Sequence, residues 1–341
     1  MSYIKCEPLN VGYICIIKTK HHHNLKGNTT MENSINGIHH ITAIAGNAKR
    51  NYDFYTKTLG LHMVKKTVNF DDPETYHFYY GDKVGTPGTI LTFFPWENIQ
   101  TGRRGARQAT EIGYSVPENS FDFWLKRFED HNVTYNKIAE KFGEPYLTFL
   151  DPDGLKLELT ASKTPDLRLP WETEEVKAEN ATKGFHSITI TTNKMQPTAD
   201  ILTGVFGYKL LEQNVNRFRF VTDAVDNAAI VDLVEVAGEV AGHVAGGSVH
   251  HVAFRVANEE VLMQYREKLV ALGMNITEKI DRNYFYSLYF REPGGVLFEL
   301  ATDNPGFAVD EAVEELGLGL KLPAQYEQHR NALIKVLPKL D

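Results

Sequence analysis

The chain has 341 residues, 42% hydrophobic and 23% charged, which is typical of a globular protein with room for two domains or four small modules. Its net charge of -8 and pI near 5.9, with lysines and arginines scattered along the chain, argue against nucleic acid or an anionic membrane as a partner. The two cysteines, Cys6 and Cys15, exclude a disulfide framework or thiolate site in the rest of the chain, which suits a reducing cytoplasm and leaves histidines and carboxylates to hold any metal.

The first residues differ in character from those that follow. We expect residues 1–36 to be an N-terminal extension that is disordered or non-native, with Met31 as a candidate natural start. The apolar run from Val11 to Ile17 is short for a bilayer span and precedes no small-residue cleavage site, so neither an anchor nor a signal peptide is expected. The histidines at 21–23 are given no metal role.

Four segments of about sixty residues then share one order of elements: a strand, a helix, and strands that end in a hydrophobic run. They cover residues 37–96, 107–161, 184–236 and 247–302. Amphipathic helices are expected at 48–61, 120–133 and 259–274. The sequence therefore predicts an α+β fold of four βαβββ modules, paired into two domains with curved, barrel-like mixed sheets and outer helices.

The composition between the modules suggests domain boundaries. Residues 162–183 are rich in proline and acidic residues, which predicts a linker between a first domain at 37–161 and a second at 184–303. Residues 304–341 are expected to form a C-terminal tail that ends in a helix packed on the body.

A pair of histidines stands in the first strand of two modules, His39-His40 in "GIHHITAI" and His250-His251 in "GSVHHVAF". Strand side chains alternate between faces, so the apolar series that follows each pair puts the first histidine on the helix side and the second on the opposite face. Glu299, in the last strand of the fourth module, shares the face of His251. The second histidine of each pair is therefore the better candidate ligand.

Alignment of the modules shows what such a site would lack. The place of His40 and His251 is taken by Glu111 in the second module and Ser187 in the third. The place of Glu299 is taken in the first three modules by, in order, Thr92, Glu158 and Asp232. If the first and fourth modules face each other, their common cavity offers two imidazoles and one carboxylate, with a threonine where a fourth ligand could have stood.

Two histidines and one carboxylate leave neighbouring metal positions open, which is the arrangement of non-haem Fe(II) enzymes that bind O2 and substrate together. Fe(II) is favoured, while Zn(II), Mn(II) and Co(II) also accept these ligands. A lone strand histidine is more often structural, and that interpretation is given to His62, His77, His131, His243 and His329. The acids of the middle modules are expected to be paired or solvated, because several carboxylates would repel one another without a cation.

From Gly37 onward the sequence resembles the vicinal-oxygen-chelate superfamily, which includes glyoxalase I, bleomycin-resistance proteins and extradiol dioxygenases. The segment "LYFREPGGVLFE", residues 288–299, fits the extradiol dioxygenase pattern that ends in a metal-binding glutamate. The segments "YHFYYGDKVGTPGT" and "HHVAF" are similar to the hydroquinone-cleaving branch. That resemblance implies metal ligation by His40, His251 and Glu299.

One difference separates this chain from catechol-cleaving members. Those begin the pattern with an acid–base histidine, whereas Ile280, Asp281 and Arg282 occupy that region here. The resemblance to the hydroquinone branch assigns proton transfer and oxyanion stabilisation to Tyr289, Arg282 and His250, and places His39 and Thr42 at the substrate or behind the ligands. Strand alternation disagrees for His39 and His250, and a β-bulge near the strand start would reconcile the two.

These expectations combine into a metal-dependent dioxygenase that opens hydroquinone-like aromatic diols with O2 and works in the cytoplasm. One alternative is a glyoxalase-like divalent-metal isomerase or lyase, which Thr92 argues against because that chemistry in the family uses a fourth protein ligand. Another is a protein that sequesters an aromatic drug, which gives the three ligands no purpose. The aromatic residues of "YHFYY" and "RNYFYSLYF" either stack against the substrate or fill the core. Ring substituents and the oligomeric state, including a homo-oligomer, are left open.

Overall fold

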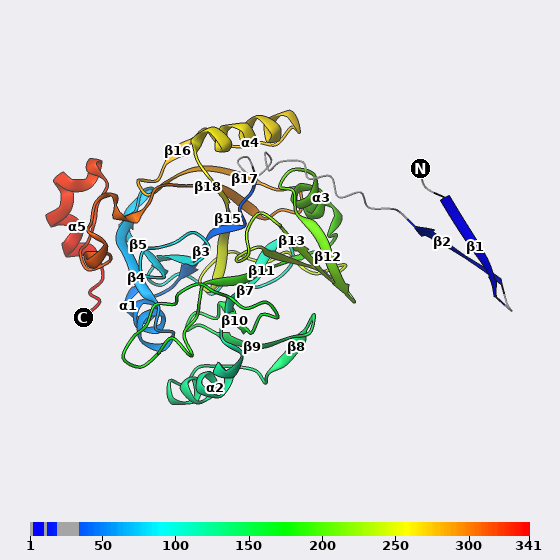
Figure 1. Cartoon of the computed structure of the whole chain (residues 1–341). Helices are drawn as coiled ribbons and strands as arrows, with labels where there is room; N and C mark the ends of the chain where they lie inside the picture. Colours follow the sequence, from blue (N-terminus) through cyan, green and yellow to red (C-terminus); the bar gives the residue numbers. More distant parts are fainter. Residues whose placement is uncertain (1–2, 10–11, 19–33) are drawn as a thin grey trace. The chain divides into compact units, whose positions relative to one another are not determined.

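The structure is a computed structural model that describes residues 3–9, 12–18 and 34–341 (Figure 1). Within the expected extension it contains two antiparallel strands, β1 (Tyr3–Leu9) and β2 (Gly12–Lys18), where the sequence predicted no regular structure. Met31 and the histidines at 21–23 lie outside the described residues.

Each of the four modules has the predicted order of elements. The first comprises β3 (Ile38–Ala45), α1 (Ala48–Asp53) continued by a π-helical turn (Phe54–Thr58), β4 (His62–Asn69), β5 (Asp72–Gly81) and β6 (Ile90–Pro95). The second comprises β7 (Gln108–Ser115), a 3-10 turn (Glu118–Ser120), α2 (Phe121–Asp130), β8 (Ala139–Lys141), β9 (Glu144–Leu150) and β10 (Lys156–Thr160). The third comprises β11 (Phe185–Thr192), α3 (Gln196–Gly204), β12 (Lys209–Asn214), β13 (Arg217–Val221) and β14 (Ile230–Glu235). The fourth comprises β15 (Ser248–Val256), α4 (Glu259–Ala271), β16 (Ile280–Asp281), β17 (Phe285–Arg291) and β18 (Leu297–Pro305).

The modules pair into two curved, mixed sheets of eight strands each. One sheet has the order β16-β17-β18-β15-β3-β6-β5-β4 and joins the fourth module to the first. The other has the order β12-β13-β14-β11-β7-β10-β9-β8 and joins the third module to the second. Each sheet therefore takes one module from either side of the linker, so the halves 37–161 and 184–303 expected from the sequence are not the two sheets.

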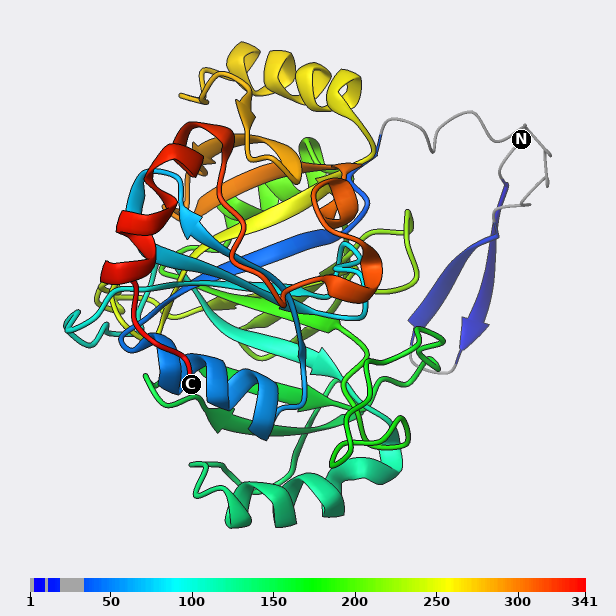
Figure 2. The same cartoon turned by 90° about the vertical axis from the view of Figure 1, so that its left-hand side faces the viewer.

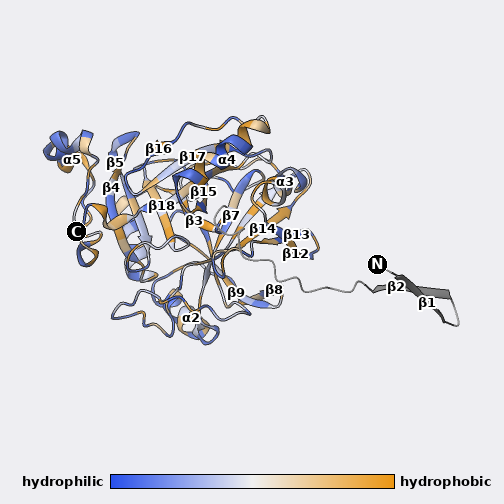
Figure 3. Ribbon diagram, turned by 45° about the horizontal axis from the view of Figure 1, so that its top comes forward, coloured by the Kyte–Doolittle hydropathy of each residue, from blue (hydrophilic) through white to orange (hydrophobic). Residues whose placement is uncertain are grey.

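Helices lie on the outer faces of the sheets (Figure 2). Apolar side chains of strands and helices together form the buried core. In α2, Trp124 and Phe128 lie on one side of the helix at a spacing of four residues, and the ring of Phe128 packs against that of Phe149 of β9, with centroids 4.6 Å apart. Helix α4 begins where the Asn258 side chain accepts a hydrogen bond from the backbone N–H of Val261. In Figure 3 the orange, apolar colour is seen in parts of central strands such as β18, whereas α5 is mostly in the blue, polar colour.

The C-terminal tail packs on the sheet of the first and fourth modules. It contains three 3-10 turns (Phe307–Val309, Val313–Glu315, Ala324–His329) and the predicted helix, α5 (Arg330–Val336). Leu320 bridges to Lys66 of the edge strand β4, and the ammonium of buried Lys65 lies 2.6 Å from the carboxylate of Asp310. The tail thus covers an edge that would otherwise offer unpaired backbone groups. Among the described residues, no helix is long and apolar enough to cross a lipid bilayer.

Candidate metal centre and cavity

The two histidine pairs lie on neighbouring central strands of one sheet. β3 and β15 run antiparallel, and β15 runs parallel to β18. Ala253 of β15 lies opposite His40 on one side and opposite Glu299 on the other. His251 precedes Ala253 by two residues and therefore shares its face of the sheet. Strand pairing alone thus brings the three predicted ligands to one place.

The ligand atoms of these three residues converge. Nε2 of His40 and Nε2 of His251 lie 3.1 Å and 2.8 Å from Oε2 of Glu299, and 3.4 Å from each other. All three side chains are buried, Glu299 completely. In the part of the chain that the structure describes, this is the one group of three histidine, cysteine or carboxylate side chains whose ligand atoms all lie within 4.8 Å of one another.

The local hydrogen bonds fit a cation at this point. Ser287 donates to Oε1 of Glu299, whereas Oε2 is buried with no hydrogen-bond partner of acceptable geometry, although both imidazole nitrogens are near it. A buried carboxylate oxygen without a donor is costly unless a cation neutralises it. Two imidazole nitrogens and this oxygen are donors that a divalent transition-metal ion accepts. The residues therefore fit a divalent metal.

The protonation states favour metal binding as well. Burial raises the pKa of Glu299, but the adjacent imidazoles of His40 and His251 outweigh it and hold that pKa well below 4.5. Burial lowers the pKa of His251 below 6.5. An ionised carboxylate and a neutral imidazole are the forms that ligate metals.

Two β-bulges explain how adjacent histidines act together. In the pairing of β15 with β3, the register skips His250 between Val249 and His251, and skips His39 between Ile38 and His40. A bulged residue leaves the strict alternation of the strand. As a result, Nδ1 of His39 lies 2.9 Å from Nδ1 of His40, and the corresponding nitrogens of His250 and His251 are 2.8 Å apart. The bulges resolve the disagreement between strand alternation and the family pattern.

Each first histidine is therefore a hydrogen-bond partner of a ligand candidate. Nε2 of His39 also lies 3.1 Å from the carbonyl oxygen of Thr302, so a proton on this nitrogen leaves Nδ1 free to accept from Nδ1–H of His40. That tautomer exposes the Nε2 lone pair of His40 toward Glu299. His39 does not line the cavity beside the ligands, whereas His250 does.

A cavity of about 480 Å³ opens on the ligand side of the sheet. Of the predicted residues, it is lined by His40, Thr42, His250, His251, Arg282 and Tyr289. Of the aromatic residues that the sequence left undecided between cavity and core, Tyr79, Phe285 and Tyr289 line it, and its aromatic wall also contains Phe70, Phe94 and Trp96. The alternate residues Tyr76, Phe78 and Tyr80 are in the core instead.

Arg282 and Tyr289 form a pair at the cavity. Nε–H of Arg282 donates to the hydroxyl of Tyr289 at 3.3 Å, and the guanidinium carbon lies 5.3 Å from the centre of the tyrosine ring. Burial and the charge of Glu299 raise the pKa of Tyr289, although Arg282 opposes them. Tyr289 is therefore a neutral phenol that can donate a proton at neutral pH.

His77 lines the cavity, although the sequence analysis had counted it as structural. Its Nε2 lies 3.0 Å from Oγ1 of Thr92, and its Nδ1 lies 2.9 Å from the hydroxyl of Tyr79. Thr92 is the residue at the fourth-ligand position, and its Oγ1 lies 2.8 Å from Oγ1 of Thr42. Alternation in 76–80, applied as for the histidine pairs, would have placed His77 and Tyr79 on the ligand face.

The corresponding point of the other sheet is occupied by cationic side chains. Arg219 contacts both carboxylate oxygens of Asp232 at 2.9 Å and 3.1 Å, and Lys141 lies 2.7 Å from Glu158. Glu111 pairs at 2.6 Å with Lys156. The middle acids are thus paired, as expected, and the guanidinium and ammonium groups neutralise carboxylates where the first sheet gathers metal ligands.

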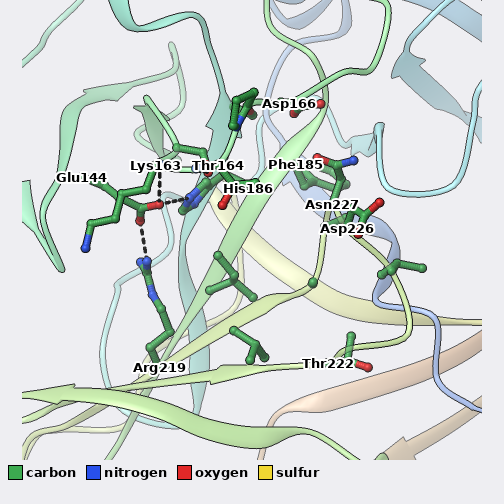
Figure 4. Close-up of a pocket in the computed structure, with 18 of the residues that line it drawn as sticks. Glu144, Lys163, Thr164, Asp166, Phe185, His186, Arg219, Thr222, Asp226 and Asn227 are labelled. Carbon is green, nitrogen blue, oxygen red and sulfur yellow. Dashed lines mark hydrogen bonds and ion pairs between the residues drawn. The ribbon is translucent and has the colours of Figure 1, made fainter. Parts of the chain in front are cut away.

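A second cavity, of about 610 Å³, opens beside this network. Figure 4 shows Glu144 between Arg219 and His186, and the imidazole Nε2 of His186 is 3.3 Å from the Glu144 carboxylate. These side chains are already paired with one another. The linker also lines this cavity, and within it Arg168 pairs with Asp166 at 2.7 Å.

Sequence comparison places the chain in one superfamily and finds relatives that are named as dioxygenases. The model of the Glyoxalase/Bleomycin resistance protein/Dioxygenase superfamily matches residues 37–159 and 184–300. The Bacillus subtilis (strain 168) protein named "Putative ring-cleaving dioxygenase MhqO" is 43% identical over 297 residues, which cover 87% of this chain and 94% of the relative. "Chlorohydroquinone/hydroquinone 1,2-dioxygenase" of Sphingobium indicum is 34% identical over 309 residues, which cover 89% of this chain and 96% of the relative.

Solved structures share the same architecture. A crystal structure described as a "putative dioxygenase" from Bacillus subtilis superposes with a TM-score of 0.86 at 41% identity, covering 90% of this chain and 98% of that one. Glyoxalase I from Zea mays superposes with a TM-score of 0.59 at 13% identity, covering 78% of this chain and 92% of the maize chain, so the two share the fold.

Proposed function

We infer the function from the premise that the chain belongs to the glyoxalase/bleomycin resistance protein/dioxygenase superfamily. It is a ring-cleaving dioxygenase, an oxidoreductase that opens hydroquinone-like aromatic diols with O2. Relatives named as ring-cleaving dioxygenases and as a hydroquinone dioxygenase, matched along nearly their whole length, support this function.

All three candidate ligands approach the metal position from the same side, and this geometry is the observation that best supports the proposed function. Three protein atoms converge from one face of the sheet, and the cavity lies on the other side of them. The fourth corner holds Thr92, whose hydroxyl is engaged with Thr42 and His77. A site of this kind leaves room for a diol oxygen and O2 beside a metal, whereas an isomerase of the same family would use a fourth protein ligand.

We propose Fe(II) as the resident ion, held by His40, His251 and Glu299, while Mn(II), Zn(II) and Co(II) are other ions that these ligands accept. When bound, Fe(II) supplies the redox chemistry that couples an aromatic diol to O2, and we propose ring opening beside a hydroxyl-bearing carbon, as in extradiol cleavage. His39 and His250 would keep the two ligand imidazoles in the tautomer that presents Nε2, through the Nδ1 contacts of 2.9 Å and 2.8 Å.

Residues around the cavity would donate protons to the substrate and stabilise negative charge that develops on it. Tyr289, a neutral phenol, would donate its proton to a substrate oxygen, and Arg282 would stabilise negative charge that develops there. Burial lowers the pKa of His250 to about 3, so its imidazole is neutral; because its Nδ1 accepts from Nδ1–H of His251, its Nε2–H would donate a hydrogen bond to a diol oxygen. Thr42 would contact the substrate beside His40. The rings of Phe94 and Phe285 would hold the aromatic substrate by stacking.

The function is tested by loading the protein with Fe(II) under anaerobic conditions, adding O2, and measuring oxygen consumption with three compounds. Hydroquinone is expected to drive oxygen uptake, while catechol and the adduct of methylglyoxal with glutathione are not. Isomerisation of the adduct without oxygen uptake would contradict the proposal.

A ligand variant tests the site itself. His251→Ala is expected to lower bound metal and to reduce turnover by at least about 100-fold, because even loss of an outer partner of a ligand commonly costs 10–100-fold. The fold should survive, as judged by far-UV circular dichroism. His62→Ala is the matched control, since His62 stacks on Trp171 outside the cavity. Near wild-type turnover in His251→Ala would exclude His251 as a ligand.

A further inference from the structure

We infer that Tyr79, His77 and Thr92 form a hydrogen-bonded relay that fixes the Thr42 hydroxyl as a donor toward the cavity and keeps the fourth corner of the metal site neutral. This assignment rests on the proposed function for its substrate, a hydroquinone, and it makes His77 a positioning residue for that substrate. None of the three side chains is a metal ligand candidate.

Distances define the relay. The hydroxyl of Tyr79 lies 2.9 Å from Nδ1 of His77, Nε2 of His77 lies 3.0 Å from Oγ1 of Thr92, and Oγ1 of Thr92 lies 2.8 Å from Oγ1 of Thr42. Thr42 and Thr92 are paired residues of the parallel strands β3 and β6, and Tyr79 of β5 is paired with Thr92. The order of the four groups is therefore set by the sheet.

Burial decides the direction in which the protons point. The Tyr79 side chain is 1% exposed, and among the residues that the structure describes its hydroxyl has His77 as its hydrogen-bond partner. If Nδ1–H of His77 donated to Tyr79, the phenol proton would be buried without an acceptor, at a cost of about 1–3 kcal/mol. Tyr79 therefore donates to Nδ1, and the proton of the neutral imidazole resides on Nε2.

The proton on Nε2 of His77 determines the direction of the remaining hydrogen bonds in the relay. Nε2–H of His77 donates to Thr92, so the Thr92 hydroxyl uses its own proton to donate to Thr42. The proton of Thr42 is then directed at the cavity, where Thr42 lies beside His40. A donor at this point recognises an oxygen atom of the diol. A carboxylate at position 92 would instead approach the metal as a fourth ligand.

Aromatic packing holds the relay rigid. The imidazole of His77 lies between the rings of Tyr79 and Phe94, with centroids 4.1 Å and 4.3 Å away. Behind Tyr79 the tail contributes Phe307, whose ring is 5.2 Å from that of Tyr79 and stacks on Tyr284 at 5.1 Å. The C-terminal tail thus packs against the relay through Phe307.

Two variants break the relay without changing shape. Tyr79→Phe removes the donor hydroxyl and keeps the ring, and Thr92→Val replaces the hydroxyl with a methyl group. Tyr284→Phe is the matched control, because it removes a phenol from the same cluster whose partner is Asp310 at 3.1 Å. Zn(II)-loaded protein is used without O2, so that binding is measured apart from turnover.

We expect Tyr79→Phe and Thr92→Val to weaken anaerobic hydroquinone binding, measured by calorimetry, by about tenfold, the effect of one lost hydrogen bond. Zinc content should match that of the wild type, and Tyr284→Phe should bind as the wild type does. Unchanged affinity in both relay variants would overturn the inference, as would a loss of zinc that accounts for the weaker binding.

Histidine nitrogen shifts, measured by NMR and assigned with His77→Gln, provide a second readout that needs no substrate. The relay requires the Nε2–H tautomer of His77 in the wild type and a mixture of tautomers in Tyr79→Phe. An Nδ1–H tautomer in the wild type would overturn it. If wild-type protein failed to bind hydroquinone, the proposed function would be wrong, and the tautomers alone would decide for or against the relay.

Discussion

Asp151 is a buried carboxyl outside the metal site, in the turn between β9 and β10. It accepts hydrogen bonds from the Tyr55 hydroxyl at 3.0 Å and from the backbone N–H groups of Asp153 at 2.9 Å and Leu155 at 2.8 Å. Burial and the neighbouring charge of Asp153 nevertheless raise its pKa from 3.8 to about 7. The folded state therefore binds a proton at pH values where the unfolded chain has released it.

The raised pKa of Asp151 determines how the stability of the protein changes with pH. The contribution of Asp151 to stability is complete below pH 3.8, falls as the pH rises, and is lost once the pH passes about 7. Asp151→Asn, which stays neutral, should therefore gain stability over the wild type by about 2–4 kcal/mol at pH 8 and by much less at pH 5. Urea denaturation at the two pH values measures this, with Asp130→Asn on the exposed end of α2 as control. An equal difference at both pH values would contradict it.

At this same scale, alternation along strands was enough to predict the convergence of His40, His251 and Glu299 on one face. It was insufficient for His39 and His250, because a bulge removes a residue from the alternation and depends on the pairing of two strands far apart in the sequence. His77 was missed for another reason. Its strand carries no second histidine, so it was interpreted as structural, although alternation in residues 76–80 places it with Tyr79 on the ligand face.

At the scale of the elements, buried ion pairs between strands of the middle modules neutralise the carboxylates that these strands carry. Arg219 of β13 is 3% exposed and contacts Glu144 as well as Asp232. Arg219→Met should remove the guanidinium from both carboxylates, leaving Glu144 with His186 and Asp232 with Arg217 at 3.3 Å each, and lower the free energy of unfolding by about 3–5 kcal/mol.

The matched control is Lys209→Met, because Lys209 pairs with Asp223 at the surface, where an ion pair contributes less than about 1 kcal/mol. Chemical denaturation of both variants gives the comparison. Equal losses would mean that burial adds nothing to the cost of the broken pair.

The helices and the order of elements were predictable from periodicity, since α2 and α4 lie within the expected ranges. The π-helical turn Phe54–Thr58 was not, because it depends on a backbone hydrogen bond from Leu59 to Phe54 rather than on residue type. The position of the tail against β4 could not be predicted from the sequence either, because the contact of Leu320 with Lys66 joins segments about 250 residues apart.

At the scale of the whole molecule, the metal ligands join the first module to the last. A bound ion therefore stabilises the folded state by linking neighbouring strands that are about two hundred residues apart in the sequence. At a free Zn(II) concentration of 100 times the dissociation constant, stability should rise by about 2.7 kcal/mol, and a chelator should lower the melting temperature by about 5 °C.

Calorimetric scans of the zinc-loaded and chelated protein measure this difference. His251→Ala should melt at the same temperature with and without zinc. A chelator effect of equal size in that variant would mean that the stabilising ion binds elsewhere.

The pairing of β3 with β15 has a consequence for synthesis. His40 leaves the ribosome about two hundred residues before His251, and Glu299 follows later still. A growing chain therefore carries one imidazole of the set until its final module emerges, and a single imidazole holds a divalent metal weakly. Translation order thus delays metal binding until the strands that carry all three ligands have been made.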